Sequence, residues 1–90
     1  MYKEFYSVEI TRKLAKLKKK DLAHYNIVRK KIDQILGNPE HSYKDLHYNM
    51  KGLQRVHLGH FVLVFRIDIQ NEKIFFEDYD HHDKIYKNQT

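Results

Sequence analysis

The chain has 90 residues, 41% of them hydrophobic, with three Gly and one Pro, and we expect residues 1–90 to form one compact domain. Because the sequence contains no Cys, disulfide bonds, zinc–thiolate sites and thiol nucleophiles are excluded. No apolar run approaches the roughly 18 residues that a membrane-spanning helix requires, and the first residues lack the apolar core of a signal peptide. We therefore expect a cytoplasmic protein with no membrane partner.

The formal net charge of +5 is unevenly distributed. Residues 1–60 contain 13 Lys or Arg against 6 Asp or Glu, whereas residues 61–90 contain 4 against 6. A basic field of this kind attracts polyanions and contributes salt-dependent affinity through phosphate contacts. Basic small domains also bind acidic proteins, so charge alone does not identify the partner.

The first third of the sequence predicts one strand and one basic helix. Residues 2–7 alternate loosely between aromatic and polar side chains, which favours a strand. Thr11 is a candidate N-cap for a helix. Its apolar stripe follows i, i+4 and i+7 spacing at Ile10, Leu14 and Leu17. Another face of the same helix collects lysines, namely Lys13, Lys16 and Lys20.

A second helix is predicted to start at Asp21 and to stop at Gly37, Asn38 and Pro39. Its apolar positions keep helical spacing at Leu22, Tyr25, Val28, Ile32, Ile35 and Leu36. Neither helix can bury its apolar stripe alone. We therefore expect a hairpin of two helices packed on a sheet.

The remaining residues predict a loop, three strands and a polar tail. Residues 40–52 show no period and are expected to form a loop. Strands are predicted at 53–58, 61–67 and 73–79, with the second covered on both faces because it is almost continuously apolar. The expected fold is a small α+β domain with the order β-α-α-β-β-β and a largely antiparallel sheet. Residues 80–90 are expected to form a polar tail.

Two segments of the sequence are distinctive, KGLQRVHLGHFVLVF at residues 51–65 and DYDHHDKIY at residues 78–86. They resemble the RelE/ParE superfamily of toxins from type II toxin–antitoxin modules, in particular an archaeal branch. The resemblance implies two helices on a largely antiparallel sheet and an endoribonuclease that cleaves messenger RNA on the ribosome. It also implies a cognate antitoxin, which blocks the toxin in a hetero-oligomer.

The sequence departs from the arginine-based site of well-studied members. Val62 and Asp80 occupy the positions where those members carry arginines. A histidine-based variant of the superfamily is the better match. That variant implies catalytic roles for His57, His82 and Tyr86, with His47 as a looser match that would contact RNA.

Two histidines suit metal-independent cleavage of RNA by its own ribose 2′-hydroxyl. With an ordinary pKa near 6.5, one imidazole can accept the 2′-hydroxyl proton while a second protonates the departing 5′-oxygen. We expect His57 and His82 to be this pair. Asp80 and Asp83 should favour protonated His82, whereas Arg55 should disfavour protonated His57, so His82 is expected to be the acid. Arg55 or Lys51 would stabilise the transition-state charge, and Tyr86 would stack on a base or orient a phosphate oxygen.

Other interpretations of the same residues stay open. The lysines Lys13, Lys16 and Lys20 would contact RNA phosphates in a nuclease, but such a face can also be merely solvated. Tyr86 can equally be a hydrophobic anchor. His57, His60, His81 and His82 could ligate zinc or nickel, but adjacent His81 and His82 should diverge in an extended segment, so we expect no metal cofactor.

Two other functions share this fold. A ParE-like toxin would poison DNA gyrase without cleaving RNA, and an inactive homologue would only bind an antitoxin.

Overall fold

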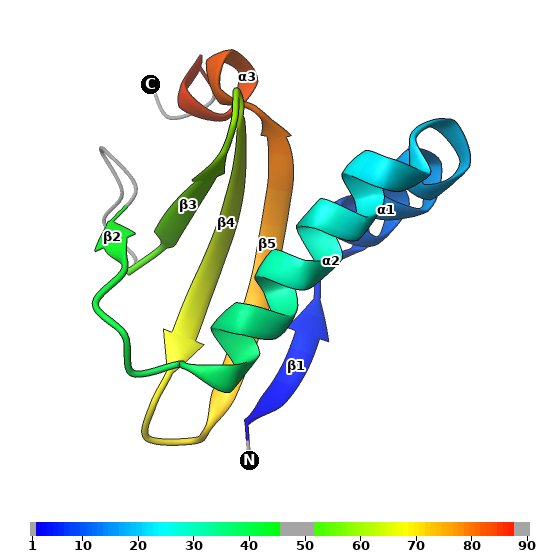
Figure 1. Cartoon of the computed structure of the whole chain (residues 1–90). Helices are drawn as coiled ribbons and strands as arrows, with labels where there is room; N and C mark the ends of the chain where they lie inside the picture. Colours follow the sequence, from blue (N-terminus) through cyan, green and yellow to red (C-terminus); the bar gives the residue numbers. More distant parts are fainter. Residues whose placement is uncertain (1, 46–51, 88–90) are drawn as a thin grey trace.

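A computed structural model describes residues 2–45 and 52–87. The order of elements in these residues is β-α-α-β-β-β-β-α (Figure 1). The bounds are β1 Lys3–Tyr6, α1 Val8–Lys20, α2 Leu22–Gly37, β2 Lys44–Asp45, β3 Gln54–Leu58, β4 Phe61–Asp68, β5 Lys73–His81 and α3 His82–Lys87. Within this part of the chain, no helix combines the length and apolar content needed to cross a membrane.

The five strands form one sheet in the order β1-β5-β4-β3-β2. Strand β1 pairs with β5 in parallel, and every other pair is antiparallel. Figure 1 shows α1 and α2 together on one side of the sheet and α3 at the end of the sheet near the turn between β3 and β4. The predicted α+β architecture and the helical hairpin are therefore confirmed.

The core lies in two unequal layers because β4 buries side chains on both faces. Leu63 and Phe65 point into the large core beneath the helices. Val62 and Val64 point to the opposite face, where they pack against Ile85 of α3. All four β4 side chains are at most 3% exposed, which confirms the prediction of a central strand covered on both sides.

The N-cap of α1 is Ser7, which lies four residues before the predicted cap Thr11. Ser7 has an extended backbone, and its Oγ accepts a hydrogen bond from the Ile10 N–H at 3.0 Å. The same hydroxyl donates to the Glu77 carbonyl of β5 at 2.6 Å. Thr11 lies inside the helix, so its assignment as the N-cap was wrong. The predicted start of α2 at Asp21 is confirmed, and Asp21 is its N-cap, since its side chain accepts from the His24 N–H at 3.1 Å.

Replacing Ser7 by Ala should lower the free energy of unfolding by about 1–2 kcal/mol, because it removes a helix cap and a tertiary hydrogen bond together. Urea unfolding measures this loss. Thr11→Ala is the matched control and should change stability by less than about 0.5 kcal/mol, since Thr11 is exposed. Equal losses in the two variants would contradict the assigned cap.

Two predicted irregular segments contain regular structure. The expected loop at 40–52 includes the short strand β2, where Lys44 pairs with Arg55 and Asp45 with Gln54. The expected polar tail at 80–90 begins as the end of β5 and continues as α3, which buries Ile85 to 4% exposure. Both elements depend on contacts with distant strands, which no local pattern records.

Candidate active site

The alternation of β3 places two of the predicted catalytic side chains on the sheet face opposite α1 and α2. His57 pairs with Val62, and Arg55 pairs with Val64. Directly opposed residues of antiparallel strands share a face, so both polar side chains lie on the side where α3 packs. The alternate residues of the strand, Val56 and Leu58, face the other way and pack against the large core.

Tyr86 reaches His57 because α3 folds back onto the end of the sheet. Ile85 anchors the helix against Val62 and Val64, and Tyr86 packs beside this cluster with its hydroxyl oxygen 3.1 Å from His57 Nε2. The two rings meet edge to face, with centroids 6.4 Å apart. The predicted catalytic tyrosine and histidine are therefore in contact.

Arg55 contacts the same nitrogen of His57, with Nη1 3.2 Å from Nε2. Its Nε also donates to the Asp45 carbonyl of β2 at 3.1 Å, which fixes the guanidinium. Because a guanidinium can only donate hydrogen bonds, Nε2 is the acceptor. His57 is therefore the neutral tautomer with its proton on Nδ1.

The surroundings of His57 favour this neutral form. Partial desolvation lowers the pKa of His57 below its ordinary value of 6.5, although the residue is exposed, and the positive charges of Arg55, His82 and Lys44 lower it further. A lowered pKa leaves the imidazole unprotonated at neutral pH. His57 therefore has the protonation state that a general base needs.

Replacing Arg55 by Met should raise the pKa of His57 towards 6.5, because one repelling cation is removed. The imidazole proton resonances followed by NMR against pH report this midpoint directly. Arg12→Met is the control, since Arg12 pairs with Glu9 on α1 and should leave the midpoint unchanged. A midpoint that falls or stays constant in the Arg55 variant would contradict the electrostatic account of His57.

His82 lies at the same end of β4 as His57, at the first position of α3. Its backbone N–H donates to the His60 carbonyl at 2.8 Å, which ties α3 to the turn between β3 and β4. Its Nδ1 is 3.0 Å from Asp83 Oδ1. The charge of His82 acts on the pKa of His57, so the two imidazoles are within electrostatic range of one another.

Two expectations about the neighbours of His82 need correction. His81 and His82 do not diverge, because the strand ends at His81 and the helix begins at His82, and their rings stack with centroids 4.7 Å apart. Asp80 was expected to act on His82. Instead its carboxylate accepts hydrogen bonds from Lys13 Nζ at 2.9 Å and from the His81 N–H at 2.8 Å.

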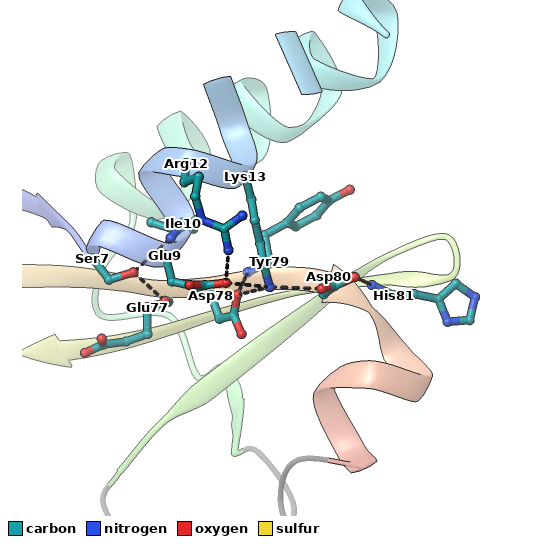
Figure 2. A network of polar contacts seen from close by, with 10 residues as sticks. All are labelled: Ser7, Glu9, Ile10, Arg12, Lys13, Glu77, Asp78, Tyr79, Asp80 and His81. Atoms are coloured by element: carbon teal, nitrogen blue, oxygen red, sulfur yellow. Dashed lines mark hydrogen bonds and ion pairs between the residues drawn. The ribbon is translucent and has the colours of Figure 1, made fainter. Parts of the chain in front are cut away.

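Figure 2 shows Lys13 extending from α1 to the edge of β5, where it meets two carboxylates. Its Nζ is 2.8 Å from Asp78 Oδ1 and 2.9 Å from Asp80 Oδ2. Although burial acts to raise it, hydrogen bonds from Lys13 and the His81 N–H hold the pKa of Asp80 below its ordinary value. Lys13 therefore joins α1 to the strand that carries His81.

Basic residues of α1 line a groove that is also bordered by the end of β5 and by α3 and that does not include His57. The groove has a volume of about 640 Å³. Lys13, Lys16 and Lys20, predicted to bind RNA, are among its lining residues. The groove also contains three cations that were not assigned to an RNA-binding surface from the sequence, namely Arg12, Lys84 and Lys87. The spacing of Lys84 and Lys87 around buried Ile85 is the helical signal that could have revealed two of them.

Two predicted site residues, Lys51 and His47, lie outside the described residues. The remaining predicted catalytic residues, His57, Arg55, Tyr86 and His82, lie at one end of the sheet. The structure adds Asp45, whose carbonyl holds Arg55, and it places Asp83 against His82 as expected.

Comparisons with known proteins agree with this fold. No family model matches the chain. An uncharacterized protein of Methanosarcina mazei is 51% identical over 79 residues, which span 87% of this chain and 91% of that protein. A Methanocaldococcus jannaschii protein named putative toxin RelE4 is 44% identical over 75 residues, 82% of this chain and 79% of its own length. The intact E. coli RelBE toxin–antitoxin complex contains a chain with a TM-score of 0.75 at 16% identity, covering 90% of this chain and 96% of that one.

Proposed function

Because the chain belongs to the RelE-like toxins of toxin–antitoxin modules, we propose that it is an endoribonuclease that cleaves messenger RNA, on the ribosome, and so inhibits translation. The observation that carries this proposal is the contact of neutral His57 with both Tyr86 and Arg55 on an open face of the sheet. A base, a fixed cation and a phenol at one point match the needs of phosphodiester cleavage.

The proposed reaction needs no water and no metal ion. His57 Nε2 accepts the proton of a ribose 2′-hydroxyl, whose oxygen attacks the adjacent phosphorus. The bond from phosphorus to the 5′-oxygen breaks, and His82 delivers a proton to that oxygen. The products are a 2′,3′-cyclic phosphate and a 5′-hydroxyl, and each proton transfer contributes on the order of 10²- to 10⁴-fold.

The cationic neighbours have supporting roles in this mechanism. Arg55 is held by the Asp45 carbonyl, so its charge is already positioned to stabilise the extra negative charge at phosphorus. Lys51 would assist it. Tyr86, which shares Nε2 of His57 with Arg55, would orient a phosphate oxygen or stack on a base when substrate displaces that contact.

RNA outside the reacting linkage would contact the cationic groove. The groove places cations of α1 and α3 on one surface, and phosphate contacts of this kind add affinity without reading sequence. Lys16 and Lys20 are its exposed α1 lysines, whereas Lys13 is already bound to two carboxylates. His47 would contact RNA near the catalytic face.

The protein partner in this proposal is a cognate antitoxin. One solved structure with this fold is the E. coli RelBE toxin–antitoxin complex, and the excess positive charge of residues 1–60 suits an acidic partner segment. Such an antitoxin would form a hetero-oligomer with the toxin.

Induced expression in a bacterial host, followed by primer extension on abundant transcripts, tests the function. We expect growth arrest with new transcript ends inside coding regions, and intact transcripts when translation initiation is blocked first. Growth arrest with DNA-damage signalling and intact transcripts would instead indicate a gyrase poison. Normal growth at confirmed expression would indicate an inactive antitoxin-binding homologue, and either of these results would refute the proposal.

A further inference from the structure

Three metal-ligating side chains lie together where β5 passes into α3. The carboxylate of Asp83 lies near both stacked imidazoles, with Oδ2 3.6 Å from His81 Nδ1 and Oδ1 3.0 Å from His82 Nδ1. One ligand atom from each of the three residues lies within 4.8 Å of the others. The cluster is partly exposed, with the histidine side chains 38% and 42% accessible, so an ion can reach it from solvent.

The spacing of these atoms suits an ion of the size of zinc or nickel. Ligands held at roughly 2.0–2.1 Å in a tetrahedral site lie about 3.4 Å from one another. The distances of 3.6 Å and 3.0 Å from the Asp83 oxygens to the two imidazole nitrogens fall on either side of that value. His81 Nδ1 accepts a hydrogen bond from the Asp83 N–H at 3.2 Å. An ion that binds this nitrogen would replace the N–H at its lone pair, because an unprotonated imidazole nitrogen is the form that binds a metal.

A third imidazole stands beside the cluster. The ring of His60 is 6.0 Å from that of His81 and 6.3 Å from that of His82, measured between centroids. The hydrogen bond from the His82 N–H to the His60 carbonyl holds the turn and the helix together. Imidazoles with a single carboxylate favour Zn²⁺, Ni²⁺ or Cu²⁺, whereas Mg²⁺ and Ca²⁺ prefer oxygen ligands.

We propose that His81, His82 and Asp83 bind one divalent transition-metal ion. Its effect on catalysis rests on the proposed function, in which His82 delivers a proton to the leaving oxygen. A ring that is held by the ion cannot occupy the position of that acid. The ion is therefore an inhibitor of RNA cleavage, and it enters no step of the reaction.

Calorimetric titration of the purified, chelator-treated protein with NiCl₂ tests the site without reference to activity. We expect one ion per chain, with affinity lowered at least about tenfold in His81→Gln and in Asp83→Asn. His41→Gln is the control, because His41 is an exposed histidine that stacks on Tyr43, and it should bind nickel as the native protein does. Absence of binding, or binding that both site variants retain in full, would overturn the proposal.

An RNA cleavage assay of the same proteins separates the ion site from the nuclease. Nickel should inhibit the native protein over the concentrations at which it binds. For His81→Gln, the nickel concentration that halves the variant's own metal-free cleavage rate should be at least about tenfold higher than for the native protein. A metal-independent ribonuclease in the same buffer controls for nickel acting on the RNA. Full cleavage at saturating nickel would overturn the inhibitory role of the ion. If the protein binds nickel but the metal-free protein cleaves no RNA, the proposed function is overturned and the ion site is retained.

Discussion

Replacing His57 by Ala is expected to lower the rate of RNA cleavage by at least about 100-fold. The imidazole is the contact point of Arg55 and Tyr86, and its lowered pKa keeps it unprotonated at neutral pH. Methyl in place of imidazole leaves no group there that can take the 2′-hydroxyl proton. Single-turnover cleavage of a ribosome-bound message measures the loss.

The stability of this variant distinguishes catalysis from folding. His57 is exposed on β3, so His57→Ala should change the free energy of unfolding by less than about 0.5 kcal/mol. His41→Ala replaces another exposed histidine and should keep the full cleavage rate. Retention of cleavage by the His57 variant at native stability would remove the proposed base from the mechanism.

Replacing Lys13 by Met should destabilise the fold by about 2 kcal/mol, because two partly buried carboxylates lose their shared cation. The Lys13 side chain is 22% exposed, and those of Asp78 and Asp80 are 30% and 22% exposed. Urea unfolding at pH 7 measures the effect. Lys16→Met is the control, since Lys16 is an exposed lysine of the same helix and should cost less than about 0.5 kcal/mol.

The destabilisation by Lys13→Met should depend on pH. The pKa of Asp80 is lowered in the folded state, so its ion pair contributes stability above the ordinary value of 3.8 and loses it as the pH falls through the lowered value. The difference between native and variant protein should therefore shrink between pH 5 and about pH 2. A difference that stays constant over that interval would indicate that Lys13 acts by packing its aliphatic stem.

The sequence predicted those elements whose hydrophobic period is long enough to read. Helix α2 has apolar positions over four turns, and β4 is almost continuously apolar, so both were found with nearly correct bounds. The start of α1 was predicted too late because Val8, the first residue of the helix, is 87% exposed and does not belong to the apolar stripe. Strand β2 has two exposed residues and exists through its pairing with β3, which no local pattern encodes.

The candidate site likewise contains residues that the sequence placed correctly and contacts that it could not predict. Period-two alternation along β3 was enough to place Arg55 and His57 on one face. The contact of His57 with Tyr86 required α3, a helix of six residues, which is too short for its period to show. The partners of Lys13 are more than 60 positions away along the chain, so no local pattern indicated them. Lys13 was therefore assigned to RNA binding, whereas its ammonium group is bound to two carboxylates of β5.

The chemical ends of the cleaved RNA test the histidine mechanism most directly. We expect chelator-treated protein to produce 5′-hydroxyl ends, which a polynucleotide kinase labels without prior phosphatase treatment, paired with 2′,3′-cyclic phosphates. RNA whose target ribose carries 2′-O-methyl should stay intact, because it has no hydroxyl to attack the phosphorus. Fragments with 5′-phosphate ends, or cleavage of the methylated RNA, would show that water is the nucleophile and would contradict the account.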